Sequence, residues 1–130
     1  MSETKNKVEF PQTATALFTI DFQMDYFPRG RCPLWRADRA LRRTRQLLDW
    51  ARQSGIPVMH IRHATDRAGA RFLIAGTPGT ALHPGLGIQE GGTIIDKRFP
   101  NSFRETDLES RLRALGATTV IWAGMISWMC

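Results

Sequence analysis

The stretch that decides the fold is ATALFTID, residues 14–21, a short apolar run with branched side chains. Such a run is typical of a strand that is buried on both faces of a sheet. Three further runs of this kind follow it along the chain. They are IPVMHIRH at 56–63, GTIIDKRF at 92–99 and TTVIWAG at 118–124. The sequence therefore predicts four buried strands.

Two amphipathic helices are predicted between these strands. The first covers about residues 37–53, where apolar residues recur at helical spacing and Gly55 follows as the terminating residue. The second covers TDLESRLRALG, residues 106–116, with Thr106 and Glu109 as a capping box and Gly116 as the stop. Alternation of buried strands with amphipathic helices indicates an α/β fold, in which helices pack on the faces of a parallel sheet.

The chain is predicted to form one domain, residues 14–130, behind a flexible N-terminal tail, residues 1–13. The tail lacks the apolar stretch of a signal peptide, and no apolar run approaches the ~18 residues of a membrane span. Cys32 and Cys130 are too few for a disulfide framework. We therefore expect a cytoplasmic protein that does not bind membranes.

The net charge of +6 raises the alternative of a nucleic-acid partner. Much of the charge lies in the first predicted helix, where the arginines fall mainly off the apolar stripe. A solvated helix face explains this pattern, and the chain has no zinc-finger spacing or glycine-aromatic RNA signature. No nucleic-acid partner is predicted, and salt-dependent retention on DNA would support the alternative.

Chemically useful residues follow three of the predicted strands. Asp21 ends the first strand, Lys97 ends the third, and Cys130 lies just past the fourth. Ligands of parallel sheets bind beyond the carboxyl ends of the strands, so we expect these side chains to meet at one edge. A thiol needs a base to take its proton, and a lysine can stabilise the thiolate or an oxyanion. Together the three residues form a plausible set for acyl transfer from a small amide.

The sequence resembles the isochorismatase-like cysteine hydrolases in several motifs that occur in the same order. These are ALFTIDFQMDYF, FLIAGTPGTALHPGL, DKRFPNSFRETDLESRLRALG and VIWAGMISWMC, which together cover nearly all the chain after about residue 13. The resemblance implies a three-layer α/β/α fold around a parallel, six-stranded, Rossmann-like sheet.

The resemblance also implies roles for individual residues. Asp21 would be the general base, Lys97 its electrostatic partner and Cys130 the nucleophile. Backbone N–H groups of Ile126, Met129 and Cys130 would form the oxyanion hole. The implied reaction is hydrolysis of a C–N bond in a small-molecule amide, through an acyl-enzyme intermediate. Many members are dimers or tetramers, so a homo-oligomer is expected for a full-length chain.

The sequence departs from the family pattern in three respects. It has no Asp-x-His motif, so no metal and no other cofactor is expected. Trp128 and Ser127 replace the usual residues near the cysteine, which puts the substrate class in doubt. Family members continue past the cysteine with a helix and further strands, so the C-terminal strands and helices are expected to be missing. That helix N-terminus would favour a thiolate, and the α-carboxylate of Cys130 would oppose it.

Two interpretations of the function therefore stay open. The first is an active cysteine hydrolase. The alternative is a truncated, catalytically inactive remnant that acts only by binding or oligomerisation. Four residues are candidates for a substrate pocket, although the aromatic ones are also compatible with a core position: Gln23, Phe27, Trp35 and Trp128. His60 and His63 differ by three positions within a strand and should face opposite sides of the sheet.

Overall fold

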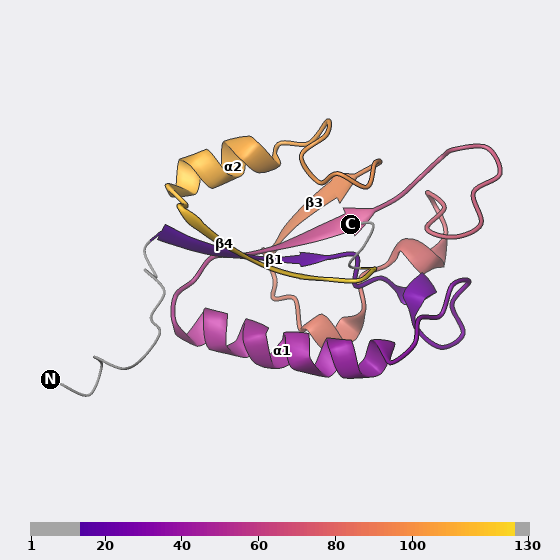
Figure 1. The fold of residues 1–130 in the computed structure, drawn as a ribbon, viewed down its shortest axis with the longest axis horizontal. Helices are drawn as coiled ribbons and strands as arrows, with labels where there is room; N and C mark the ends of the chain where they lie inside the picture. The colour runs from indigo at the N-terminus through magenta and orange to yellow at the C-terminus, as the bar shows by residue number, and fades with distance from the viewer. Residues whose placement is uncertain (1–13, 127–130) are drawn as a thin grey trace, which may run out of the picture.

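A computed structural model describes residues 14–126 of the chain (Figure 1). The four strands are β1 (Thr15–Ile20), β2 (Val58–His63), β3 (Thr93–Lys97) and β4 (Thr119–Gly124). The two α-helices are α1 (Ala37–Gln53) and α2 (Leu108–Leu115). Three short 3-10 helices lie in the connections: η3 (Met24–Tyr26), η4 (Pro78–Thr80) and η5 (Pro84–Leu86). All four predicted strands and both predicted helices are therefore present.

The four strands form one parallel sheet in the order β3-β2-β1-β4. β1 lies inside the sheet, with Ile20 opposite Ile61 of β2 and Gly124 of β4. β4 lies at one edge of this sheet, where the side chain of Trp122 is 46% exposed and its ring contacts Phe18. No helix between residues 14 and 126 has both the length and the apolar character needed to cross a bilayer.

Helices cover both faces of the sheet, as Figure 1 shows, with α1 on one face and α2 on the other. On the α1 side, Leu17 of β1 packs in one hydrophobic cluster with Leu41 and Leu48. On the α2 side, Phe18 packs in a second cluster with Leu108. Because successive residues of a strand point to opposite faces, a strand covered on both faces is mostly apolar, and Thr15 and Thr19 are the polar residues of β1. The three-layer α/β/α arrangement follows because α1 buries one face of the sheet and α2 buries the other.

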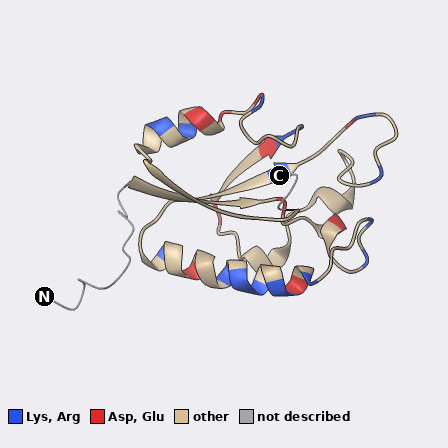
Figure 2. Cartoon of the chain, viewed as in Figure 1, with Lys and Arg blue, Asp and Glu red and all other residues tan. Residues whose placement is uncertain are grey.

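The prediction for α1 is confirmed to the residue at both ends. Leu41, Thr44, Leu48 and Ala51 of the predicted stripe are buried, and Gly55 has the left-handed backbone expected after a helix, with φ 74°. Figure 2 shows basic residues at several positions along α1, and Arg39, Arg42 and Arg43 among them are exposed. Another, Arg45, forms an exposed ion pair with Asp49 one turn away, at 3.0 Å. The outer face of α1 is therefore basic and exposed to solvent, as the sequence predicts.

The predicted capping box of α2 is wrong. The helix begins at Leu108 with Asp107 at the N-cap, and Asp107 makes no side-chain capping bond. The Thr106 hydroxyl instead donates a hydrogen bond of 2.6 Å to the carbonyl of Ser102. The same hydroxyl oxygen accepts from Leu108 N at 3.4 Å, so Thr106 contacts the start of the helix without forming the predicted reciprocal pair with Glu109. Gly116 does end the helix, in a left-handed conformation with φ 65°.

His60 is buried in the sheet, and its burial makes the stability of the fold depend on pH. Its ring lies 2.6 Å from the Thr19 hydroxyl across β1 and β2, and only 2% of the residue is exposed. Burial, together with the positive charge of Arg52, lowers the pKa of His60 to about 4 from 6.5. The unfolded chain therefore binds a proton that the folded chain excludes. Stability from this source is complete above pH 6.5 and is lost as the pH falls towards 4.

We predict that the free energy of unfolding falls by about 2 kcal/mol between pH 7 and pH 5 on account of His60. Urea unfolding at both pH values measures the loss. The variant His60→Gln cannot gain the proton, so its stability should fall by about 2 kcal/mol less over the same interval. An equal pH dependence in both proteins would contradict the prediction.

Candidate active site

Two of the three predicted catalytic residues meet at the carboxyl end of the sheet. Asp21 directly follows β1, and Lys97 is the last residue of β3. The Nζ atom of Lys97 lies 3.4 Å from Oδ2 of Asp21, and both side chains are fully buried. Since β2 lies between β1 and β3, the two side chains reach each other past the end of β2. The predicted Asp–Lys pair is therefore present as a buried ion pair.

The backbone of Asp21 is in the left-handed region, with φ 61°. Its N–H donates to the carbonyl of Ile61, which continues the pairing with β2, and its carbonyl accepts from Gln23 N. Aspartate tolerates this conformation better than most side chains, although at some cost in strain. The sheet thus fixes Asp21 at the point where the chain turns away from β1.

The Asp21 carboxylate is buried without a hydrogen-bond donor. Within residues 14–126, neither Oδ1 nor Oδ2 has a hydrogen-bond partner, and the ion pair with Lys97 is its only contact of this kind that the structure gives. Lys97 Nζ instead donates to the carbonyl of Pro100, at 2.9 Å. Buried carboxylates normally accept several hydrogen bonds, because an unsatisfied one is costly. Asp21 therefore has free capacity to accept a proton or a donor.

His63, the last residue of β2, lies beside this pair, and sequence reasoning did not assign it to the site. Burial lowers the pKa of His63, Lys97 lowers it further, and Asp21 opposes both effects. The imidazole is consequently neutral at pH 7. The signal that could have identified His63 is its position at a strand end, level with Lys97 in the register.

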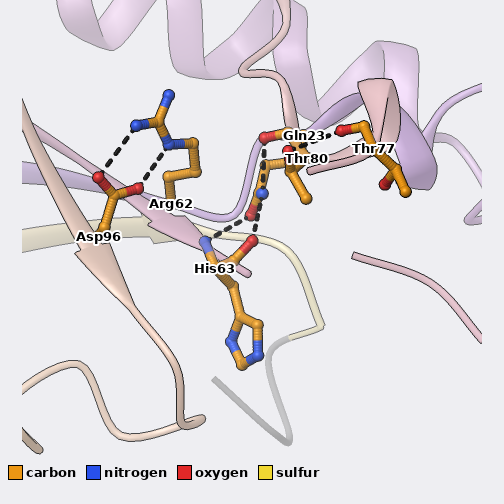
Figure 3. Close-up of polar contacts among 6 residues, drawn as sticks. All are labelled: Gln23, Arg62, His63, Thr77, Thr80 and Asp96. Carbon is orange, nitrogen blue, oxygen red and sulfur yellow. Dashed lines mark hydrogen bonds and ion pairs between the residues drawn. The ribbon is translucent and has the colours of Figure 1, made fainter. Parts of the chain in front are cut away.

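Gln23, one of the predicted pocket residues, is hydrogen-bonded to the backbone of two distant segments. Its amide nitrogen donates to the carbonyls of His63, at 2.7 Å, and Thr80, at 2.8 Å, while its amide oxygen accepts from His63 N, at 2.9 Å (Figure 3). The residue is fully buried. Gln23 therefore ties η4 to the end of β2 and positions the site without lining a pocket.

Asp25 is a second residue that holds the connection between β2 and β3, residues 64–92, in place. Its Oδ2 accepts a hydrogen bond of 2.7 Å from Leu73 N, and its Oδ1 accepts from Arg31 N. Gly79 lies directly against this carboxylate, where a Cβ atom would overlap it. The segment at 69–87 thus contains two short 3-10 helices, η4 and η5, and is fixed against the sheet by buried polar side chains.

A cavity of about 550 Å³ lies near this end of the sheet. Its described lining includes Tyr26, His63 and residues 65–67, 70–73 and 98–100, but neither Asp21 nor Lys97. Its walls combine aromatic rings of Tyr26, Phe72 and Phe99 with charged side chains. The volume is in the range of small-molecule sites.

The other predicted pocket residues lie elsewhere. Phe27 is 2% exposed and packs in the core on the α1 side, with its ring against His83. Trp35 is 83% exposed and stacks with the guanidinium of Arg36. Neither residue lines the cavity. The aromatic type of a side chain does not by itself indicate a pocket position, because aromatic residues more often lie in a core or on an exposed loop than in a substrate pocket.

The predicted oxyanion stretch is described only in part. The pairing of β4 with β1 brings Gly124 level with Ile20, and Met125 N donates to the carbonyl of Ile20, at 3.1 Å. Ile126 follows with φ 56°, a strained conformation for a β-branched residue. Trp128, Met129 and Cys130 lie outside the described residues. Within residues 14–126, no three His, Cys, Asp or Glu side chains are grouped so that they could hold a metal ion.

Comparisons with known proteins agree on one family. A family model for the isochorismatase domain matches residues 15–130. The chain is 39% identical over 116 residues to the uncharacterized isochorismatase family protein YddQ of Bacillus subtilis, covering 89% of this chain and 64% of that protein. It is 34% identical over 117 residues to a streptothricin hydrolase of Streptomyces noursei, covering 88% of this chain and 41% of that protein.

A solved structure gives the same result for the fold. The cysteine hydrolase of Pseudomonas syringae superimposes on the chain with a TM-score of 0.84 at 25% identity. The alignment covers 95% of this chain and 65% of that one. The chain therefore spans less than two thirds of the length of each of these three relatives.

The buried ion pair makes a prediction about stability. Lys97→Met should lower the free energy of unfolding by about 3–5 kcal/mol, because Asp21 is left as an uncompensated buried charge. Adding Asp21→Asn should restore much of that loss. Urea unfolding of the wild type, the two single variants and the double variant gives the coupling energy, which we expect to be about 2 kcal/mol or more.

The nearby pair Arg62–Asp96 is a control, since it joins the neighbouring strands β2 and β3 at 2.6 Å but has side chains that are 35% and 60% exposed (Figure 3). Its coupling energy, from Arg62→Met and Asp96→Asn, should be below about 1 kcal/mol. A coupling for Asp21–Lys97 as small as that of the control would contradict the structure's assignment of a buried ion pair.

Proposed function

The chain belongs to the isochorismatase family of hydrolases, and on that premise we propose that it cleaves the C–N bond of a small amide by nucleophilic catalysis. In this proposal Cys130 is the nucleophile, Asp21 is the general base and Lys97 stabilises the negative charge. The observation that supports it most is the buried Asp21 carboxylate, which has no hydrogen-bond donor among the described residues.

The proposed reaction begins with the transfer of the Cys130 thiol proton to the Asp21 carboxylate. The thiolate sulfur attacks the amide carbonyl, and a tetrahedral oxyanion forms. Backbone N–H groups of Ile126, Met129 and Cys130 would donate to this oxygen. The C–N bond then breaks, and the proton held by Asp21 passes to the leaving nitrogen. Water hydrolyses the resulting thioester, with Asp21 accepting a proton from the attacking water and the sulfur regaining one.

The position of Lys97 supports its proposed role. The ammonium is fully buried and lies 3.4 Å from the Asp21 carboxylate that is proposed to accept the thiol proton. Once Asp21 is protonated, the same ammonium would compensate the negative charge on sulfur. A fixed cation in a water-excluded site needs little reorganisation during the reaction, which increases its effect.

The comparisons support the reaction class more than the substrate. One similar structure is that of a cysteine hydrolase, and one similar protein is a streptothricin hydrolase. Both names denote hydrolysis, and the first agrees with a nucleophilic cysteine. The aromatic and charged walls of the cavity favour a small, partly polar amide over a peptide chain.

The test is hydrolysis of a panel of small amides by the protein and four variants. Cys130→Ser should abolish turnover, and Asp21→Asn should lower kcat/KM by at least about 10²-fold, as loss of a general base does. Lys97→Gln should have a similar effect. Asp96→Asn, which removes an exposed carboxylate next to Lys97, should leave kcat/KM within about twofold.

Mass spectrometry gives an independent readout. In a Cys32→Ser background, rapid quenching during turnover should trap one acyl group on Cys130. Turnover that persists in Cys130→Ser, or the absence of any acyl adduct from an amide that is hydrolysed, would exclude the proposed mechanism.

A further inference from the structure

A row of exposed side chains runs along the outside of α1 and has no part in the proposed chemistry. This outer row consists of Arg39, Arg43, Gln46 and Trp50, all of which are exposed. Residues at this alternating four- and three-residue spacing lie one above another on a helix. Arg43 donates a hydrogen bond of 3.4 Å to Oε1 of Gln46 within the row. At a rise of about 1.5 Å per residue, the row is about 16 Å long.

The acidic residues of α1 do not neutralise the outer row. Asp49 pairs with Arg45 at 3.0 Å and lies 3.9 Å from Arg52, on the flank of the helix. Within residues 14–126, no carboxylate lies within ion-pair distance of Arg39 or Arg43. The row therefore carries two guanidinium groups that are free to bind an anionic partner.

The stability of α1 does not account for these charges. The helix begins at Ala37, so Arg39 lies in its first turn. The positive end of the helix dipole is at that turn, where a cation lowers the stability of a helix. Departures of this kind from local preference are expected at functional surfaces.

An exposed tryptophan lies near each end of α1. Trp35, two residues before the helix, is 83% exposed, and the guanidinium of Arg36 lies 4.2 Å from its ring centroid. Trp50 is the last residue of the outer row and is 37% exposed. Tryptophan and arginine are the residues that most often dominate the affinity of protein–protein interfaces. The composition of this face is therefore that of a contact surface for another protein.

Charge and shape favour an acidic protein segment as the partner. All the basic residues of α1 are arginines, whose planar guanidinium groups bind carboxylates in a bidentate manner. A second copy of the chain would place arginine against arginine. Single-stranded nucleic acid prefers a charged groove with stacking rings, and neither cavity in the described part of the chain includes residues 35–50. A bilayer surface would need a broad apolar face, and α1 packs its apolar face against the sheet.

We infer that the outer row of α1 docks an acidic helical segment of a partner protein. A helix laid along α1 has the same three- and four-residue spacing of side chains, so two carboxylates one turn apart can pair with Arg39 and Arg43. An apolar side chain of the partner lies against Trp50. The inference does not depend on the proposed hydrolysis, because none of these residues belongs to the candidate active site.

The probe is a fluorescein-labelled, alanine-based peptide of about 18 residues, which is long enough to populate a helix in water. Its glutamates form one row along the helix, with a leucine at the end of that row. Fluorescence anisotropy measures its Kd for the whole protein at about 0.05 M NaCl, where screening is weak. This row peptide should bind at least about fivefold more tightly than a peptide of the same composition whose glutamates are distributed around the helix.

Two double variants separate the outer row from overall charge. Arg39→Gln/Arg43→Gln should weaken binding of the row peptide at least about fivefold. Arg111→Gln/Arg113→Gln removes the same charge from exposed side chains of α2, on the opposite face of the sheet, and should change the Kd less than about twofold. Circular dichroism and the urea midpoint verify that both double variants remain folded.

Four results would overturn the inference. The first three are equal affinity for the two peptides, an affinity that is unchanged in Arg39→Gln/Arg43→Gln, and no measurable binding of the row peptide. The fourth is tighter binding of a labelled oligothymidylate of equal charge, or of phosphatidylserine vesicles, than of the row peptide. That result would assign the face to nucleic acid or to a membrane surface instead.

Discussion

The burial of β1 on both faces and along both edges is the constraint on which the other features depend. Leu17 faces the α1 cluster, Phe18 faces the α2 cluster, and β2 and β4 pair with the two edges of the strand. A strand in that position has no contact with water, so its end is a place where a charged side chain can be desolvated. Asp21 occupies this end, and its burial and its pairing with Lys97 are consequences of the sheet.

The site is held together mainly by side chains that do no chemistry. Gln23 and Asp25 follow Asp21 closely in sequence, and both direct their polar atoms to the backbone of distant segments. These hydrogen bonds fix the connection between β2 and β3 against the carboxyl end of the sheet. The same connection supplies part of the lining of the cavity, including Leu73, whose N–H donates to Asp25.

The charges of this protein fall into two different environments. On α1 the arginines are exposed and pair weakly along the helix, as Arg45 and Asp49 do. At the carboxyl end of the sheet, Asp21 and Lys97 are fully buried, where water screens their charges less, whereas Arg98 and Asp66 at the cavity are 64% and 71% exposed. The net charge of +6 does not separate the two groups.

The sequence by itself determined the elements and their type. Apolar runs and helical spacing located four strands and α1, and the order of elements implied a parallel sheet with helices on its faces. Asp21 and Lys97 could be identified because each ends a strand, and the carboxyl ends of parallel strands converge. The motifs added the proposed nucleophile, Cys130, whose placement the structure does not describe.

Only the tertiary structure decided which side chains face the site. His63 lies at the site because β2 lies between β1 and β3 in the sheet. The amide of Gln23 is hydrogen-bonded to backbone groups that are distant in sequence. Phe27 is buried in the core and Trp35 is exposed on the surface, although both are aromatic residues of one loop. The physical reason is that local patterns report burial along one element, whereas a cavity and its charges arise from contacts between segments that the sequence keeps apart.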